Sequence, residues 1–240
     1  MTNDVPIVLV HGGAHRAACW NLLMRELEAV GRRTVAVDLP GYGRDSTIDP
    51  TPRTLADGIE ATAEVIARLA RPVMLIGHSL GGMTISGVAE CMSDAIDHLV
   101  YLAAVVPRDG ESAESMATAD GMKASAATYV LDDGERIGFR PEMARGIFYN
   151  DCPDDIVAAA TEALVSTDLG YLTTPVTLSA DRFGKIRKTY IVCTRDQAID
   201  PETQRIFARI HPGMAIREIE ASHSPFLSKP TELAALLCCL

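Results

Sequence analysis

Residues 77–81 have the sequence GHSLG and place one serine, Ser79, between two glycines. This segment directly follows the apolar run 73–76, and the residues after it have the pattern of a helix. A strand that turns this sharply into a helix holds its central residue in a strained conformation and exposes the hydroxyl above the sheet. The flanking glycines leave room for the turn, and the start of the helix favours developing negative charge. We therefore predict that Ser79 is a nucleophile.

A serine hydroxyl needs a base to remove its proton. Of the six histidines, His223 is the best candidate, because it lies in the loop 221–225 between the last predicted strand and the last predicted helix. Loops at that edge of a parallel sheet are where such folds build their sites. His223 also follows Ser79 in the chain, as the base does in enzymes that carry their serine on this kind of turn.

An acidic residue that orients the imidazole would come from the loop after the apolar run 189–193. This loop offers Asp196 and Asp200. Asp200 immediately precedes Pro201, and the pair is typical of a helix N-cap followed by the first helical residue. Asp196 lies closer to the end of the predicted strand, so we predict that Asp196 is the acid and that Asp200 caps a helix.

The segment 11–15, with the sequence HGGAH, follows the first apolar run. Its two glycines let the backbone approach a ligand closely, and an N–H here could pair with the N–H of Leu80 to bind an oxyanion. His11 and His15 also have the spacing of a metal-binding pair on a helix. However, the glycines favour a loop and no third ligand is evident, so we predict no metal.

The loops above are positioned by apolar runs that alternate with helical patterns, which is typical of an α/β fold with a mostly parallel, doubly wound sheet covered on both faces. The predicted strands are residues 5–10, 34–37, 73–76, 99–103, 189–193 and 216–219. Residues 107–184 interrupt the alternation and contain no strong strand pattern. We predict one domain, with a core of residues 1–106 and 185–240 and a helical cap of residues 107–184 inserted after the fourth strand.

Composition excludes several classes of protein. Hydrophobic residues make up 48% of the 240 residues and charged residues 22%, which is typical of a globular chain. The net charge of −10 disfavours nucleic-acid binding, and no apolar run is long enough to span a membrane. The first apolar run has no basic segment before it, and none of the six cysteines forms a CxxC pair, so we expect a cytoplasmic protein. A monomer and a homodimer both fit this composition.

Four segments together resemble the α/β-hydrolase superfamily: VLVHGGAHRAACW, GHSLGGM, YIVCTRDQAIDPE and ASHSPFLSKP. They are most similar to the branch that contains plant methylesterases and hydroxynitrile lyases, with their bacterial esterase relatives. The resemblance implies a triad of Ser79, Asp196 and His223, with the amides of Gly13 and Leu80 as the oxyanion hole. It also implies hydrolysis of a small carboxylic ester through an acyl-enzyme, without a cofactor.

Residues of the first loop and of the cap are candidates for the substrate pocket. Trp20 resembles the tryptophan that follows the first loop in this family, and large cap side chains could form an apolar wall. The candidates are Gly12, His15, Trp20, Met116, Met122, Tyr129, Phe148, Tyr149 and Tyr171. We also expect a bulky side chain at Gly13 to disturb the oxyanion donor.

Other activities remain open alternatives. The lyases of this branch carry a threonine after the first-loop histidine and a lysine after the catalytic histidine, where this chain has Gly12 and Ser224. No ammonium is therefore available at that position to hold a leaving cyanide. A C–C bond hydrolase with the same triad, or a non-catalytic receptor for a small molecule, also fits the sequence. Steady turnover of a short acyl ester would favour an esterase.

Overall fold

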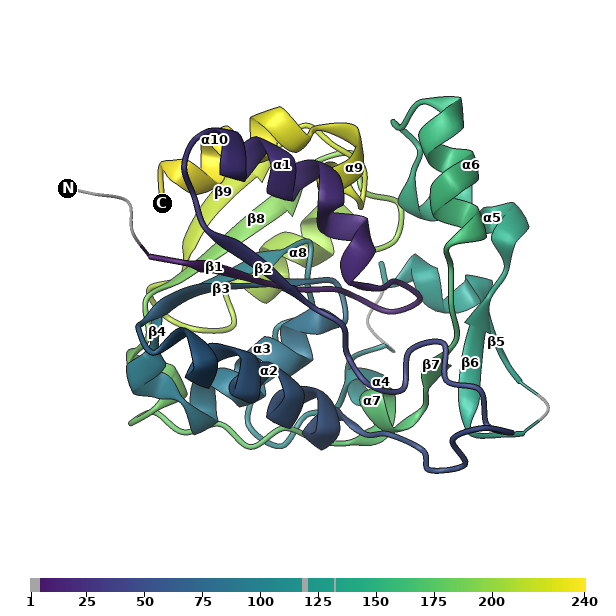
Figure 1. Ribbon diagram of the computed structural model, residues 1–240, viewed down its shortest axis with the longest axis horizontal. Coiled ribbons are helices and arrows are strands. Elements are labelled where there is room, and N and C mark those ends of the chain that lie inside the picture. The colour runs from purple at the N-terminus through teal and green to yellow at the C-terminus, as the bar shows by residue number, and fades with distance from the viewer. Residues whose placement is uncertain (1–4, 118–120, 132) are drawn as a thin grey trace.

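The computed structural model describes residues 5–117, 121–131 and 133–240 (Figure 1). Its centre is a sheet of six parallel strands in the order β2-β1-β3-β4-β8-β9. The strands are β1 (Ile7–Val10), β2 (Thr34–Val37), β3 (Val73–His78), β4 (Ile96–Leu102), β8 (Lys188–Cys193) and β9 (Ala215–Ile219). The prediction of a doubly wound α/β fold is thus confirmed, because the chain reverses its direction across the sheet after β2.

Helices cover both faces of this sheet, which explains why its central strands are apolar along their whole length. One face packs against α1 (Asn21–Ala29), α9 (Pro225–Ser228) and α10 (Pro230–Cys238). The other face packs against α2 (Leu55–Leu69), α3 (Gly81–Cys91) and α8 (Pro201–Ala208). α2 begins with a capping box, because the Thr54 backbone N–H donates to Asp57 Oδ2 at 2.7 Å. The described part of the chain has no helix long and apolar enough to cross a membrane.

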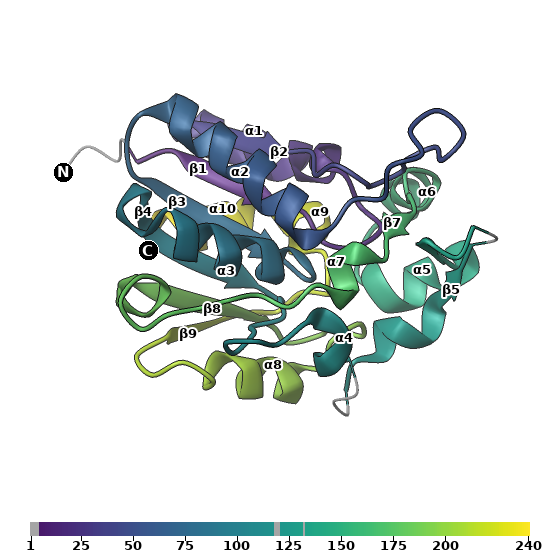
Figure 2. The same cartoon turned by 90° about the horizontal axis from the view of Figure 1, so that it is seen from below.

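The segment 107–184 contains the helices α4 (Ala113–Met116), α5 (Pro141–Phe148), α6 (Asp154–Glu162) and α7 (Gly170–Thr173). From α4 to α7, the described residues of this segment lie beyond the carboxyl ends of the central strands (Figure 2). Residues 174–184 then return along α3 to the start of β8, where Ser179 and Phe183 contact Glu90. The segment also contains an antiparallel sheet of β5 (Thr128–Val130), β6 (Arg136–Phe139) and β7 (Thr167–Asp168). The sequence predicted only helices and loops here. These strands are too short for an alternating pattern to show, which is why they were missed.

A buried ion pair attaches the cap to the core. Arg44, in the loop after β2, donates its Nε to both carboxylate oxygens of Asp168 in β7, at 2.8 and 3.0 Å. The Arg53 backbone N–H donates to the same carboxylate at 2.8 Å. Asp168 is fully buried and Arg44 nearly so, and an ion pair without water is much less screened than one at the surface. This contact fixes β7 against the loop that follows β2.

Candidate active site

Ser79 stands at the turn between β3 and α3 and has a φ of 53°, in the left-handed region that non-glycine residues rarely adopt. The turn needs small neighbours. A Cβ at Gly77 would lie 2.8 Å from the carbonyl oxygen of Gly81, and a Cβ at Gly81 would lie 2.6 Å from that of His11. The strained strand-to-helix turn predicted from the sequence is therefore present, and such strain is frequent at functional sites.

Asp196 and His223 form a buried pair on the loops after β8 and β9. Asp196 Oδ2 lies 2.7 Å from His223 Nδ1, and both side chains are almost completely buried. The other oxygen, Oδ1, accepts from the backbone N–H groups of Ala198 at 2.6 Å and Ile199 at 3.0 Å. These bonds fix the carboxylate, which in turn directs the proton of a neutral imidazole to Nδ1 and leaves Nε2 able to accept one.

Gln204 is a supporting residue that the sequence analysis missed. Its amide nitrogen donates to Asp196 Oδ2 at 2.8 Å, and its amide oxygen accepts from the Cys193 N–H at 2.9 Å. Gln204 lies in the first turn of α8, one helical turn after the N-cap Asp200. That spacing, on a helix expected to cover the sheet, was the signal that could have placed it near the end of β8. Gln204 therefore holds the carboxylate that holds His223.

His78 connects the turn of Ser79 to the loop of His223. Its Nε2 donates to the backbone oxygen of His223 at 2.8 Å, and the two rings lie 4.5 Å apart between centroids. Within the described residues, the Ser79 hydroxyl makes no hydrogen bond to His223. Catalytic hydrogen bonds are often long before a substrate binds. The structure thus pairs Asp196 with His223 and ties His223 to the residue next to Ser79.

Backbone donors on the loop 11–15 face the same turn. The N–H of Ala14 is occupied, because it donates to Thr167 Oγ1 of β7 at 3.1 Å. Within the described residues, the N–H groups of Gly13 and Leu80 have no hydrogen-bond partner. A Cβ at Gly12 would lie 2.7 Å from the Cβ of Ser79, whereas a Cβ at Gly13 would meet Leu80 Cδ2 at 3.6 Å, an ordinary contact. The loop therefore touches the Ser79 turn at Gly12, and Gly13 has room for a small side chain.

Three other buried histidines surround this turn, and burial lowers the pKa of each. The pKa is about 4 for His11 and for His15, and it is well below the ordinary value for His78. Desolvation disfavours the charged imidazolium in each case. All three are therefore neutral near pH 7 and act as hydrogen-bonding groups. Among the residues that the structure describes, no group of three or more His, Cys, Asp or Glu side chains is arranged to hold a metal ion.

A cavity of about 150 Å³ opens beside Ser79, between the core and the cap. None of the described residues that line it carries a charge. Its wall is mostly aliphatic and aromatic, with small side chains on one part. The larger wall residues include Met122, Phe139, Phe148, Leu172 and Ile199, and the small ones include Ala14, Ala113, Ala117 and Ala124. Gly13 and Leu80, the two residues with the candidate oxyanion donors, also line the cavity beside Ser79.

Two of the predicted pocket residues, Met122 and Phe148, line this cavity. The other seven are not among its lining residues. Gly12 packs against Ser79, Trp20 lies in the core on the α1 face, and Met116 is buried in the core on the opposite face. Tyr129 is 45% exposed on the outer side of the cap.

The remaining three residues, His15, Tyr149 and Tyr171, make hydrogen bonds within the protein. Tyr171 donates to the carbonyl oxygen of Pro40 at 2.7 Å, and Tyr149 bonds to His15 Nε2 at 2.8 Å. The two tyrosine hydroxyls are thus bonded within the protein, and neither tyrosine is among the lining residues of the cavity. By contrast, Asp200 has its predicted role: it is the N-cap of α8, accepting from Glu202 N at 2.8 Å and Thr203 N at 3.1 Å.

Comparison with known proteins agrees with this fold. The chain belongs to the alpha/beta hydrolase family, whose model matches residues 7–236. It is 31% identical to methylesterase 7 of Arabidopsis thaliana, over 98% of this chain and 95% of that protein. It is 27% identical to methyl jasmonate esterase 1 of Vitis vinifera, over 96% and 94% of the two chains. Among solved structures, a pyrethroid hydrolase from Sphingobium faniae JZ-2 has a TM-score of 0.88 and 27% identity, over 98% of this chain and 96% of that one.

Proposed function

We propose that this protein hydrolyses a small, uncharged carboxylic ester, with Ser79 as the nucleophile. The observation that carries the proposal is the buried Asp196–His223 pair beside a strained serine at the wall of an uncharged cavity. The names of its relatives, two esterases and a hydrolase, support ester hydrolysis at the level of the family. The finer features, which are the triad, the acyl-enzyme and the oxyanion hole, are part of this proposal.

The reaction follows from the geometry in two steps. His223 Nε2 takes the hydroxyl proton as Ser79 Oγ attacks the ester carbonyl, and the resulting oxyanion lies between the N–H groups of Gly13 and Leu80. The C–O bond to the alcohol breaks, and His223 returns the proton to the leaving alkoxide. Water then attacks the acyl-enzyme, His223 removes its proton, and Ser79 is released with the carboxylic acid.

The cavity restricts the substrate in size and charge. A cavity of about 150 Å³ with apolar walls is large enough for a benzene ring. A charged group placed there would lose its hydration without gaining a partner, which costs several kcal/mol in proteins. We therefore assign the cavity to one uncharged group of the ester, of about the size of a single ring or a short branched chain.

The test is a panel of methyl, aryl and lactone esters, measured with the wild-type protein and with Ser79→Ala. We expect turnover of at least one uncharged ester by the wild type, and a loss on the order of 10⁶ in kcat for the variant. A folded Ser79→Ala protein that keeps a tenth of the wild-type kcat, free of contaminating esterase, would contradict the proposal. Binding of an ester with at most one turnover would instead indicate a receptor.

The same panel separates the esterase from the lyase. Ser224 follows His223 and is completely buried, so no ammonium stands there to stabilise a leaving cyanide. We expect mandelonitrile to release cyanide no faster than in buffer. Release that depends on Ser79 and clearly exceeds the buffer rate would favour the lyase.

A further inference from the structure

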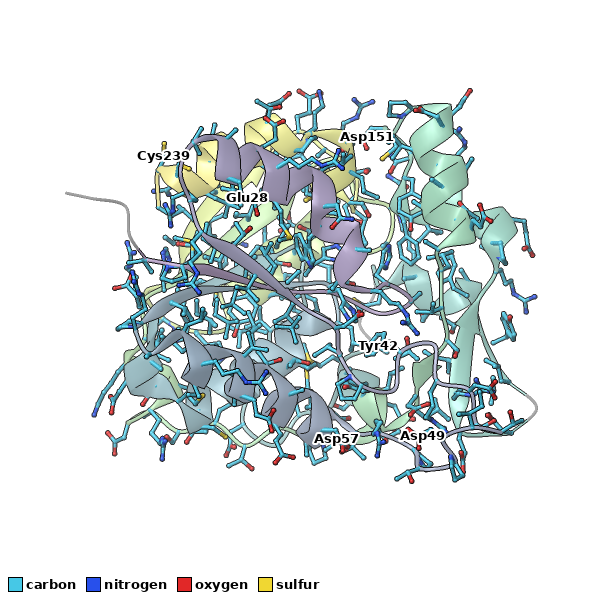
Figure 3. All side chains as sticks on the ribbon, in the orientation of Figure 1. Glu28, Tyr42, Asp49, Asp57, Asp151 and Cys239 are labelled. Carbon is cyan, nitrogen blue, oxygen red and sulfur yellow. The ribbon has the colours of Figure 1, made fainter. Side chains whose placement is uncertain are left out.

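The cap segment 148–151, which runs from the end of α5 towards α6, contacts three of the loops near the proposed site. The Phe148 and His223 rings stack with centroids 5.6 Å apart, Asn150 Nδ2 donates to the Arg195 carbonyl at 3.1 Å, and Asp151 Oδ2 accepts from Ser222 N at 2.8 Å. Asp151 is labelled in Figure 3, where the cap meets the C-terminal helices. The fourth residue, Tyr149, reaches the remaining loop, residues 11–15, through His15.

Tyr149 and His15 form a continuous hydrogen-bonded path to the oxyanion loop. The Tyr149 hydroxyl lies 2.8 Å from His15 Nε2, and His15 Nδ1 lies 2.7 Å from the carbonyl oxygen of Gly13. Tyr149 is completely buried and His15 is 5% exposed. Neither side chain lines the cavity, so neither is placed to touch a substrate there.

The chemistry of these groups fixes the direction of both hydrogen bonds. The Gly13 oxygen can only accept, so His15 Nδ1 must carry the proton. Burial keeps His15 neutral by lowering its pKa to about 4, and burial also raises the pKa of Tyr149 above its ordinary value. A neutral imidazole with its proton on Nδ1 accepts at Nε2, so the Tyr149 hydroxyl donates to His15.

The path ends on the carbonyl of Gly13, and the backbone conformation of Gly13 decides where its N–H points. A second histidine holds the preceding peptide: His11 Nδ1 donates to the Gly12 oxygen at 3.0 Å, while its Nε2 accepts from Leu39 N at 3.1 Å. The peptides on both sides of Gly13 are thus held by imidazoles, one tied to the core and one to the cap. Glycine is otherwise free to rotate its backbone, which would turn the Gly13 N–H away from the oxyanion.

We propose that Tyr149 and His15 are positioning residues: by holding the Gly13 carbonyl, the cap restricts rotation of the Gly13 backbone, so that the Gly13 N–H, on the adjacent peptide that His11 holds, stays aimed at the oxyanion. This inference rests on the proposed ester hydrolysis. Preorganised donors stabilise a transition state because they need no reorientation as charge develops. Loss of the path would therefore weaken binding of the tetrahedral state and leave binding of the planar substrate unchanged.

The test is Tyr149→Phe, which removes only the hydroxyl, with Tyr101→Phe as the matched control. Tyr101 is also completely buried, and its hydroxyl lies 2.7 Å from Ser86 Oγ in the core. The readouts are kcat, KM and the affinities for trifluoroacetophenone, which forms a tetrahedral adduct with a serine, and for acetophenone, which stays planar. We expect Tyr149→Phe to lower kcat and the trifluoroacetophenone affinity by roughly three- to tenfold, the worth of about one hydrogen bond. KM, the acetophenone affinity and all four values for Tyr101→Phe should stay near wild type.

Two variants of His15 give a second test. An asparagine amide can place an N–H near the position of Nδ1, so His15→Asn should keep more activity than His15→Leu. For His15→Leu we expect a kcat loss of about 10²-fold, as for a misplaced catalytic group.

Two outcomes would overturn the positioning role: equal kcat losses for His15→Asn and His15→Leu, or equal losses of affinity for the two ketones in Tyr149→Phe. An unchanged kcat in Tyr149→Phe, with turnover still dependent on Ser79, would overturn this inference alone. Absence of Ser79-dependent turnover in the wild type would overturn the proposed function as well.

Discussion

The core and the cap contribute to the site in different ways. The core supplies the proposed reacting groups, and each stands close to a strand end: Ser79 directly follows β3, Asp196 lies three residues after β8, and His223 lies four residues after β9. The cap supplies the wall of the cavity from short elements and loops, including Met122 and Phe148. Through the segment 148–151, the cap also forms hydrogen bonds to the loops that contain His15, Arg195 and Ser222.

This difference has a physical basis. Ladder hydrogen bonds fix the ends of parallel strands relative to one another, so groups on the first residues beyond them are placed with little freedom. Wall residues on the cap depend on packing between segments that are far apart in sequence. Changes in the core should therefore alter the rate of the chemical step, and changes in the cap wall should alter which ester is preferred.

The largest effect after loss of Ser79 itself is expected for Asp196→Asn. The amide can present an N–H to His223 Nδ1, which would place the imidazole proton on Nε2, where Ser79 needs an acceptor. We expect kcat to fall by up to about 10⁴ with a native fold. Steady-state kinetics with circular dichroism would measure both. Asp200→Asn is the matched control, and loss of activity there with retention in Asp196→Asn would exchange the two roles.

A smaller effect on the rate is expected for Gly12→Ala. The new Cβ would lie 2.7 Å from the Cβ of Ser79, so the nucleophile or the loop must shift. A misplacement of this kind can cost about 10²-fold in kcat. Gly13→Ala is the comparison variant, because its Cβ would meet only the Leu80 side chain, at 3.6 Å from Cδ2 and 4.0 Å from Cβ. Equal kcat values for the two variants would show that the loop adapts, and that this part of the core is less rigid than we infer.

The cap wall is tested by Met122→Ala, which enlarges the cavity without touching the reacting groups. We expect the ratio of kcat/KM for a hexanoyl ester to that for an acetyl ester to rise about tenfold, the scale on which apolar pockets discriminate. Val130→Ala, at a cap position that is 60% exposed, should leave the ratio unchanged. A large fall in kcat for both esters in Met122→Ala would contradict the separation between wall and chemistry.

The sequence predicted the core part of the site because each of its groups follows a readable strand. The apolar runs at 73–76 and 189–193 match β3 and β8 closely, and the loops that follow them offer one serine and two aspartates for the required roles. Ser79 was further marked by the glycines its turn requires. Gln204 was missed because its spacing from the N-cap places it near the end of β8 but does not show that its amide contacts a carboxylate.

The cap could not be predicted to the same depth. β7 has two residues and β5 three, so no alternation of apolar and polar residues marks them. Tyr149 and Tyr171 were expected in the wall, but their hydroxyls bond to His15 and Pro40, which are 134 and 131 positions away in the chain. Local patterns carry no information on such contacts. The direction in which a buried tyrosine points is decided by whichever distant acceptor the fold brings near.

The smallest expected effect is that of Asp200→Ala, a core residue close to the site that has no chemical role in our scheme. Asp200 caps α8 through Oδ1, and loss of an N-cap side chain costs about 1 kcal/mol of stability. In a chain of this size that corresponds to a fall in Tm of roughly 2–4 °C, which thermal denaturation would measure.

Because α8 also carries Gln204, the kcat of this variant reports whether a slightly weakened helix still holds Asp196. We expect kcat to stay near the wild-type value, since Gln204 is also bonded to the backbone of Cys193 and Ile199. Asp200→Ser should restore most of the stability, because serine is an equally good cap. A fall of more than tenfold in the kcat of a folded Asp200→Ala protein would mean that the two aspartates are not separable, and that the core positions its acid through the whole start of α8.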